Sequence, residues 1–288
     1  MPELTEIATG VLVATSEIYV TTTTVIVGPD GSCLVVDPAV TVADLADLAA
    51  ELAARGLRPQ AAWSTHPHWD HVLWCRELGD VPRFAAPLAA STAAAGRAQL
   101  IAAAQATAPG HDPELLGRLT ALEPAADRIP WDGPDAHVVI HDGHAPGHGA
   151  VFLPGSGTLI AGDMCSDIEI PLLDLAGRDP LGDYRAGLER LAALTGVRQV
   201  IPGHGHVGDA AEFRRRLAAD GGYTNALAGG VPFEDPRLTQ DWLRDTHSRQ
   251  LRHVAAARKV NANPPAASVA DRAAADSSIS AVSGWAWS

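Results

Sequence analysis

The chain has 288 residues, of which 47% are hydrophobic and 19% are charged. This composition excludes a disordered or coiled-coil protein, and the length suffices for a sizeable buried core. The 34 acidic residues outnumber the 21 Lys and Arg residues, and the net charge of −13 argues against a nucleic-acid partner.

Membrane and secretory features are not evident in the sequence. No apolar run approaches the roughly 20 residues that a membrane-spanning helix needs. The first ten residues, MPELTEIATG, lack the apolar core of a secretory signal. The cysteines, Cys33, Cys75 and Cys165, are odd in number and scattered, which is typical of reduced thiols. We therefore expect a cytoplasmic protein with no membrane partner.

The first part of the chain alternates between β-rich and helical sequence. Runs rich in Val, Ile and Thr predict strands at residues 11–15, 19–27, 33–36 and 61–65. A Gly-Pro-Asp-Gly sequence predicts a hairpin turn between the second and third of these strands. Helical spacing and alanine-rich composition predict helices at residues 40–55, 71–78 and 87–107.

A polar connection to about residue 130 leads into a second β-rich and helical section. Its predicted strands lie at residues 136–141, 150–153, 158–161 and 199–201. Its predicted helices lie at residues 181–194, 209–228 and 236–259. Two such sections in succession predict two packed sheets with helices outside.

The end of the chain differs in composition from the rest. From residue 261 onward Ser, Ala and Pro dominate, which predicts a flexible tail. We therefore expect a main domain at 1–230, a helical extension at 231–260 and a tail at 261–288.

The strongest chemical signal is Ser-Thr-His-Pro-His-Trp-Asp-His at residues 64–71. Backbone alternation places His66 and His68 on the same side of the chain, and Asp70 and His71 follow where the chain turns. Imidazoles with a carboxylate form a donor set typical of zinc. In the alternative interpretation, Asp70 only caps a helix and the histidines are surface residues.

Polar residues also end several other predicted strands. Asp37, Asp163 and His204 each follow an apolar run, and His144 and His148 flank an Ala-Pro-Gly sequence after the strand at 136–141. Strand ends are where layered α/β folds gather ligand-binding groups. Taken singly each is consistent with a turn residue, but together with 64–71 they predict a site.

In this order, these residues resemble the metal motifs of the metallo-β-lactamase-fold hydrolases, and the resemblance covers roughly residues 5–225. It implies an α/β fold, a four-layer αβ/βα sandwich with the site at one edge of the two sheets. It assigns a first metal to His66, His68 and His148, a second metal to Asp70, His71 and His204, and Asp163 to both. Asp37 would orient a ligand without binding metal.

The sequence offers a second candidate for the third histidine at the first metal. His144 lies four residues before His148 and could take its place at the first metal. The family pattern favours His148.

The resemblance also implies cofactors and a reaction. The expected cofactors are two divalent ions, zinc first, although the donors also tolerate iron or manganese. A metal-bound hydroxide would attack a small-molecule ester, lactone, thioester or amide, and Asp70 would carry a proton to the leaving group. The partner is then a small-molecule substrate, and pairing of the terminal helix in a homodimer stays open.

The aspartate at position 163 narrows the expected branch of the family. A bridging aspartate is similar to the glyoxalase II and lactonase-like branch, and typical zinc β-lactamases lack it at this position. Glyoxalase II enzymes recognise glutathione with basic residues, lysines among them, from a C-terminal helical region. This chain has only one lysine, Lys259, which argues against glutathione thioesters as substrates. The alternatives are a β-lactam hydrolase, a metal-binding member without hydrolytic turnover, and metal-dependent redox or lyase chemistry.

Overall fold

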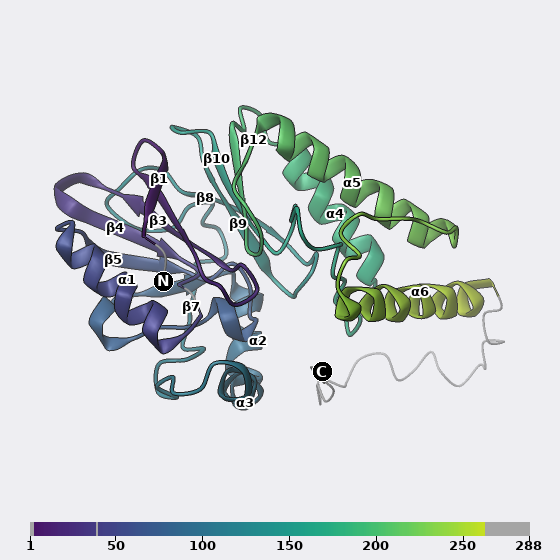
Figure 1. Ribbon diagram of the computed structural model, residues 1–288, viewed down its shortest axis with the longest axis horizontal. Helices are drawn as coiled ribbons and strands as arrows, with labels where there is room; N and C mark the ends of the chain where they lie inside the picture. The colour runs from purple at the N-terminus through teal and green to yellow at the C-terminus, as the bar shows by residue number, and fades with distance from the viewer. Residues whose placement is uncertain (1–2, 39, 263–288) are drawn as a thin grey trace.

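The computed structural model describes residues 3–38 and 40–262, and in it two β-sheets face each other with helices on their outer faces (Figure 1). The helices are α1 (Val42–Ala54), α2 (Pro87–Ala95), α3 (Arg97–Thr107), α4 (Pro180–Ala192), α5 (Ala210–Gly229) and α6 (Asp241–Ala262). This arrangement confirms the predicted layered α/β sandwich.

The first sheet has seven strands in sequential order. They are β1 (Thr5–Ala8), β2 (Val11–Thr15), β3 (Thr22–Val27), β4 (Ser32–Val36), β5 (Arg58–Trp63), β6 (Arg83–Ala85) and β7 (Thr120–Ala121). Strands β1 to β4 pair antiparallel, and β4 to β7 pair parallel. The carboxyl ends of β4 and β5 therefore lie at the same edge.

The second sheet has five strands in the order β12-β11-β10-β9-β8. They are β8 (His137–His141), β9 (His148–Leu153), β10 (Thr158–Gly162), β11 (Gln199–Pro202) and β12 (Gly208–Asp209). Only β10 and β11 pair parallel, so their carboxyl ends also share one edge.

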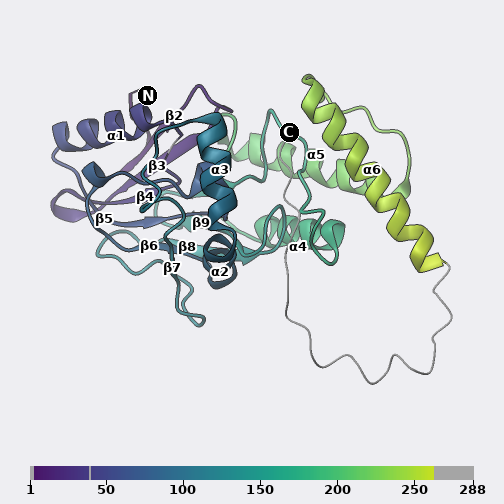
Figure 2. The ribbon, with the colours of Figure 1, turned by 90° about the horizontal axis from the view of Figure 1, so that it is seen from below.

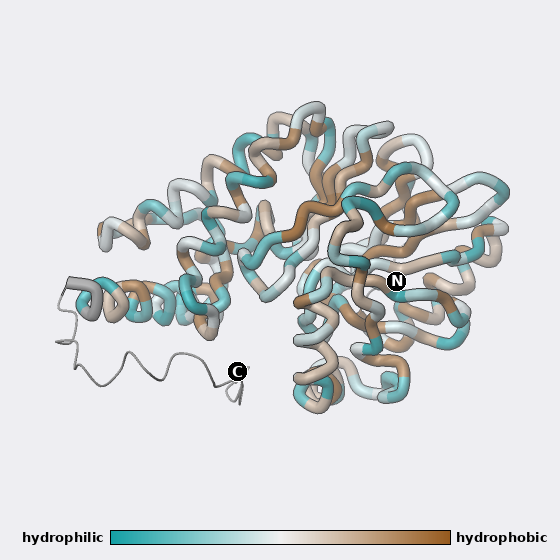
Figure 3. Tube along the Cα trace, turned by 180° about the vertical axis from the view of Figure 1, so that it is seen from behind, coloured by the Kyte–Doolittle hydropathy of each residue, from teal (hydrophilic) through white to brown (hydrophobic). Residues whose placement is uncertain are grey.

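Three apolar clusters hold the layers together. The first packs α1 and α3 on one sheet, and the second packs α4, α5 and α6 on the other. The third lies between the sheets, where Val36 and Trp63 meet Val151 and Ile201. In Figure 2 α1 and α6 lie at opposite ends of the molecule, and in Figure 3 the hydrophobic colour concentrates on the strands between the helical layers.

The two sheets are also joined by hydrogen bonds close to the strand ends. The amide of Thr22 donates to the carbonyl of Gly203 at 2.8 Å, and that of Gly149 donates to Thr65 at 2.7 Å. A side chain at Gly149 would collide with Trp63, since an added Cβ would lie 2.6 Å from Cζ2 of that ring. The sheets are therefore in direct contact beside the residues of the predicted site.

The helix predicted at residues 71–78 is wrong. The chain instead forms two short 3-10 turns, Trp69–His71 and Arg76–Leu78. The carbonyl of Val72 accepts from Gly117 instead of closing a helical turn. His71, Val72, Leu73 and Trp74 are consecutive and all buried, which leaves no solvent-facing side for a helical turn there.

Other predicted elements are confirmed with shifted ends. The helix predicted at 87–107 divides at Gly96 into α2 and α3. The predicted domain boundaries stay a prediction, and the tail predicted from 261 onward falls largely outside the described residues.

None of the helices within 3–38 and 40–262 combines the length and apolar character needed to cross a membrane.

Candidate metal centre

The candidate centre lies where strand ends of both sheets meet. Asp37 follows β4, and the segment 64–71 follows β5 in the first sheet. Asp163 follows β10 and His204 follows β11 in the second. The parallel pairs β4–β5 and β10–β11 thus direct their polar ends into one region.

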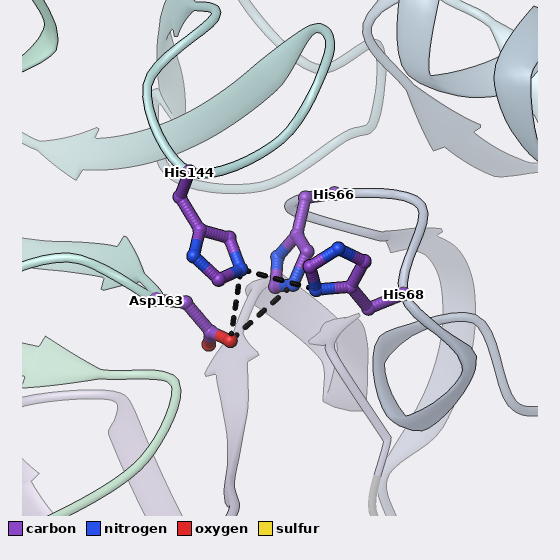
Figure 4. Close-up of side chains that lie close together, drawn as sticks. All are labelled: His66, His68, His144 and Asp163. Atoms are coloured by element: carbon purple, nitrogen blue, oxygen red, sulfur yellow. Dashed lines mark hydrogen bonds and ion pairs between the residues drawn. The ribbon is translucent and has the colours of Figure 1, made fainter. Parts of the chain in front are cut away.

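Two groups of metal-donor side chains form in this region. The first contains His66, His68, His144 and Asp163, shown in Figure 4, and the second contains Asp70, His71 and His204. Within each group the donor atoms lie within 4.8 Å of one another. His66 and His71 are fully buried.

Asp163 lies between the two groups. Its Oδ2 lies 3.4 Å from Nε2 of His66 and 3.3 Å from Nε2 of His144, both in the first group. The same oxygen lies 3.2 Å from Nε2 of His204, and Oδ1 lies 3.3 Å from Nε2 of His71, in the second. One carboxylate thus contacts donors of both groups, as a bridging ligand would.

In the second group, the spacing between donors fits a coordinated cation better than hydrogen bonds. Nε2 of His204 lies 3.4 Å from Oδ2 of Asp70 and 3.3 Å from Nε2 of His71. A tetrahedron with zinc–ligand bonds of about 2.0–2.2 Å has edges of about 3.3–3.6 Å. Nε2 of His66 and Oδ1 of Asp163 are buried and form no hydrogen bond within the described residues. The His/Asp clusters fit a dinuclear metal site.

In the first sheet, hydrogen bonds at Nδ1 orient two of the histidines. Nδ1 of His71 lies 3.0 Å from Oδ2 of Asp37, which can only accept when ionised. Thr65 donates its hydroxyl to the same carboxylate at 2.6 Å, and Nδ1 of His66 lies 3.0 Å from that hydroxyl. Both rings therefore keep Nε2 for the interior of the site, and Asp37 orients a donor as expected.

Backbone carbonyls orient two further rings. Nδ1 of His144 lies 3.0 Å from the carbonyl of Leu172, and Nδ1 of His204 lies 3.1 Å from that of Tyr19. Because a carbonyl only accepts, each Nδ1 carries a proton. The neutral form of each ring then presents a lone pair on Nε2, which faces Asp163.

The raised pKa values of His71 and His204 favour the protonated form of these two rings when no cation is bound. Burial opposes ionisation of His71, but Asp163, Asp70 and Asp37 outweigh it and raise its pKa to about 9. Burial also opposes the charge on His204, yet Asp163 and Glu169 raise its pKa well above the ordinary value. Burial lowers the pKa of His66 and His68 well below the ordinary value. A cation bound here would replace protons.

The geometry reverses the preference for His148 over His144. His148 begins β9 opposite His141 of β8, and its ring stacks between His141 at 4.6 Å and His66 at 5.2 Å, measured between ring centroids. Its ring nitrogens are buried and form no hydrogen bond within the described residues, but they belong to neither donor group. His144 lies in the turn before, and its left-handed φ of 72° accompanies a ring that reaches Asp163. His144, and not His148, joins the first group.

The contact made by Tyr19 was missed in the sequence, whereas Glu169 and His206 were open candidates for the lining of the pocket. Tyr19 falls in a predicted strand, but it lies in a turn where Tyr19 and Val20 adopt φ of 57° and 54°. Glu169 is buried, and burial with the nearby Asp163 raises its pKa to about 7 against the opposing effect of His204. His206 is exposed and pairs with Asp167 at 2.9 Å, away from both groups. No sequence pattern signalled the backbone contacts of Tyr19.

Comparison with known proteins gives a family match and structural relatives. The family model of the metallo-beta-lactamase superfamily matches residues 19–204. A beta-lactamase domain protein from Burkholderia ambifaria is 20% identical over 90% of this chain and 88% of its own, with a TM-score of 0.64. A metallo-beta-lactamase family protein from Thermus thermophilus is 20% identical over 88% and 93%, with a TM-score of 0.63.

Two further solved structures are similar to this chain. TTHA1623, solved in a di-iron-bound form, is 25% identical over 71% of this chain and 97% of its own, with a TM-score of 0.56. The inverting sec-alkylsulfatase Pisa1 from Pseudomonas sp. is 20% identical over 88% of this chain and 50% of its own, with a TM-score of 0.60. The search of curated proteins gave no match.

Proposed function

Because the chain belongs to the metallo-beta-lactamase superfamily, we propose that it is a dinuclear metal-dependent hydrolase of a small-molecule ester, lactone, thioester or amide. The observation that carries the proposal is the position of Asp163, whose carboxylate contacts His66 and His144 on one side and His71 and His204 on the other. This arrangement supports two adjacent ions held by one set of buried donors.

The proposed donors divide as the geometry groups them. His66, His68, His144 and Asp163 would hold one ion, and Asp70, His71 and His204 would hold the other with Asp163 shared. Divalent cations held there would supply Lewis acidity and make water nucleophilic near neutral pH. Zinc is our first choice, and the di-iron form of TTHA1623 keeps iron in the proposal.

Asp70 is the residue we propose to move the proton. Its Oδ2 lies 3.4 Å from Nε2 of His204 and 3.7 Å from Nε2 of His71, beside the second group. A carboxylate at this position would accept a proton from the attacking water and deliver it to the leaving group.

The surroundings of the second group favour a substrate with an apolar part. Tyr19 is 47% exposed, and its ring lies edge-on to those of Trp69 and His204, at centroid distances of 6.4 and 6.1 Å. An exposed aromatic face beside the donors offers apolar contact to an acyl or leaving group. The shared carboxylate of Asp163 supports the lactonase-like branch proposed from the sequence.

The proposal is tested by metal analysis of the purified protein and by assay with a substrate panel. The panel contains lactones, thioesters, aryl esters and a chromogenic β-lactam, each measured with and without a chelator. We expect about two ions per chain and turnover that a chelator abolishes and added zinc restores. Bound metal without turnover on any substrate would support a metal-binding member lacking hydrolysis, and absence of metal would overturn the proposal.

A further inference from the structure

The loop that follows Asp163 carries the carbonyl that orients His144. This loop, residues 164–173, contains Leu172, whose carbonyl lies 3.0 Å from Nδ1 of His144. A peptide group in a loop can rotate unless both its carbonyl oxygen and its amide N–H form hydrogen bonds. The orientation of His144 thus depends on what holds the Leu172–Leu173 peptide.

Gln250 of α6 holds that same peptide. The amide of Leu173 donates to Oε1 of Gln250 at 2.6 Å, so one peptide plane is bonded to His144 on one side and to Gln250 on the other. Nε2 of Gln250 donates to the carbonyl of Pro171 at 3.0 Å. The side-chain amide therefore pairs with the loop as a neighbouring strand would.

The position of Gln250 is itself fixed. Its side chain is fully buried, and Nε2 also donates to the hydroxyl of Tyr223 on α5 at 2.7 Å. That hydroxyl lies 2.9 Å from Nδ1 of His247, one turn earlier on α6. Burying an amide is favourable only when its hydrogen bonds are made, so this network resists other arrangements.

The other end of the loop is held from the same part of the chain. Arg237 donates to the carbonyl of Ser166 at 3.2 Å and pairs with the buried Asp220 at 2.6 Å. Ser166 in turn donates its hydroxyl to the carbonyl of His204 at 2.7 Å. Arg237 and Gln250 both lie beyond residues 19–204, the part matched by the family model.

We propose that Gln250 is a positioning residue of the metal centre. By fixing the Leu172–Leu173 peptide, it keeps the proton of His144 on Nδ1 and the lone pair of Nε2 directed at the site. The proposal rests on the proposed function in one respect, because it takes His144 as a metal donor. The helical extension is then part of the site's framework.

The experiment compares Gln250→Met with Val254→Ala, which removes buried apolar surface from the same helix and no side-chain hydrogen bond. Nitrogen-15 NMR of the metal-free proteins reports the tautomer of His144 and the exchange rate of its Nδ1 proton. We expect mixed tautomers and at least about tenfold faster proton exchange in Gln250→Met, with wild-type behaviour in Val254→Ala. Wild-type tautomer and exchange in Gln250→Met would overturn the proposal.

Zinc titration against a competing chelator gives a second readout. Loss of a group that orients a donor typically weakens metal binding about 10–100-fold, so we expect one of two zinc affinities to fall by at least tenfold in Gln250→Met. If that variant does not fold, Tyr223→Phe removes one partner of Gln250 and should change both readouts in the same direction; unchanged values there would also overturn the proposal. A wild-type protein that binds neither zinc nor iron contradicts the proposed function, and the metal-free NMR comparison still decides the role of Gln250.

Discussion

The carboxylate of Asp37 lies 3.0 Å from Nδ1 of His71, although the two residues are 34 positions apart in the chain. The same carboxylate accepts from the amide and the hydroxyl of Thr65 at 2.8 and 2.6 Å. One acidic group at the end of β4 thus sets the orientation of the segment that follows β5.

Asp37→Asn should weaken metal binding. Asparagine also tolerates the left-handed backbone of Asp37, whose φ is 48°, but its NH₂ group cannot accept from His71 and Thr65. We expect zinc affinity to fall about 10–100-fold, measured by chelator competition. Asp30→Asn is the matched control, since exposed Asp30 has a φ of 54° far from the site, and equal affinities in both variants would refute the role of Asp37.

Asp70→Asn should reduce turnover more than it reduces stability. The amide cannot take up a proton, and removal of a general acid–base group typically costs about 10²–10⁴-fold in rate. We expect kcat at saturating zinc to fall by at least 100-fold while the thermal unfolding midpoint with zinc changes little. Near-wild-type kcat would show that another group moves the proton.

His144→Ala and His148→Leu should differ in their effect on metal content. His144 contacts Asp163 through Nε2, whereas His148 belongs to neither donor group and its ring stacks on that of His141. We expect His144→Ala to lose about one ion per chain in elemental analysis and His148→Leu to retain both. The opposite result would restore the assignment suggested by the family pattern.

Acid should destabilise the metal-free protein through His141. Burial, with a smaller effect of Arg190, lowers the pKa of His141 from 6.5 to about 4. Because the unfolded state binds the proton first, stability is fully present above pH 6.5 and falls as the pH drops toward 4. The loss from this group between pH 7 and 5 is about 2 kcal/mol.

The measurement is the free energy of unfolding by urea at pH 7 and pH 5, with a chelator present. His141→Phe removes the titrating group, so its stability should fall about 2 kcal/mol less than that of the wild type over this range. An equal fall in both proteins would show that His141 is not buried in its neutral form.

The segment 64–71 was predictable because its donors are close in sequence. His66 and His68 lie on the same side through backbone alternation, and the structure places both in the first group. Asp163 and His204 were predictable as residues that follow apolar strands, since parallel neighbours direct them to one edge.

The choice between His144 and His148 was not predictable in the same way. Both flank the same Ala-Pro-Gly sequence, and only the conformation of the turn and the pairing of β8 with β9 separate them. The helix predicted at 71–78 failed because its apolar residues are buried by contacts from distant segments. The contact between Gln250 and the loop after Asp163 joins residues 77 positions apart and has no local pattern.

The position of the metal centre between the two sheets has a consequence for the stability of the protein. His66, His71 and Asp37 belong to one sheet, and Asp163 and His204 belong to the other, so ions at this position would cross-link two halves otherwise joined by apolar packing and a few backbone contacts. Such a cross-link strengthens with the concentration of free ion by mass action, about 2.7 kcal/mol at 100 times the dissociation constant. The heat resistance of the protein would then follow the availability of metal in its surroundings.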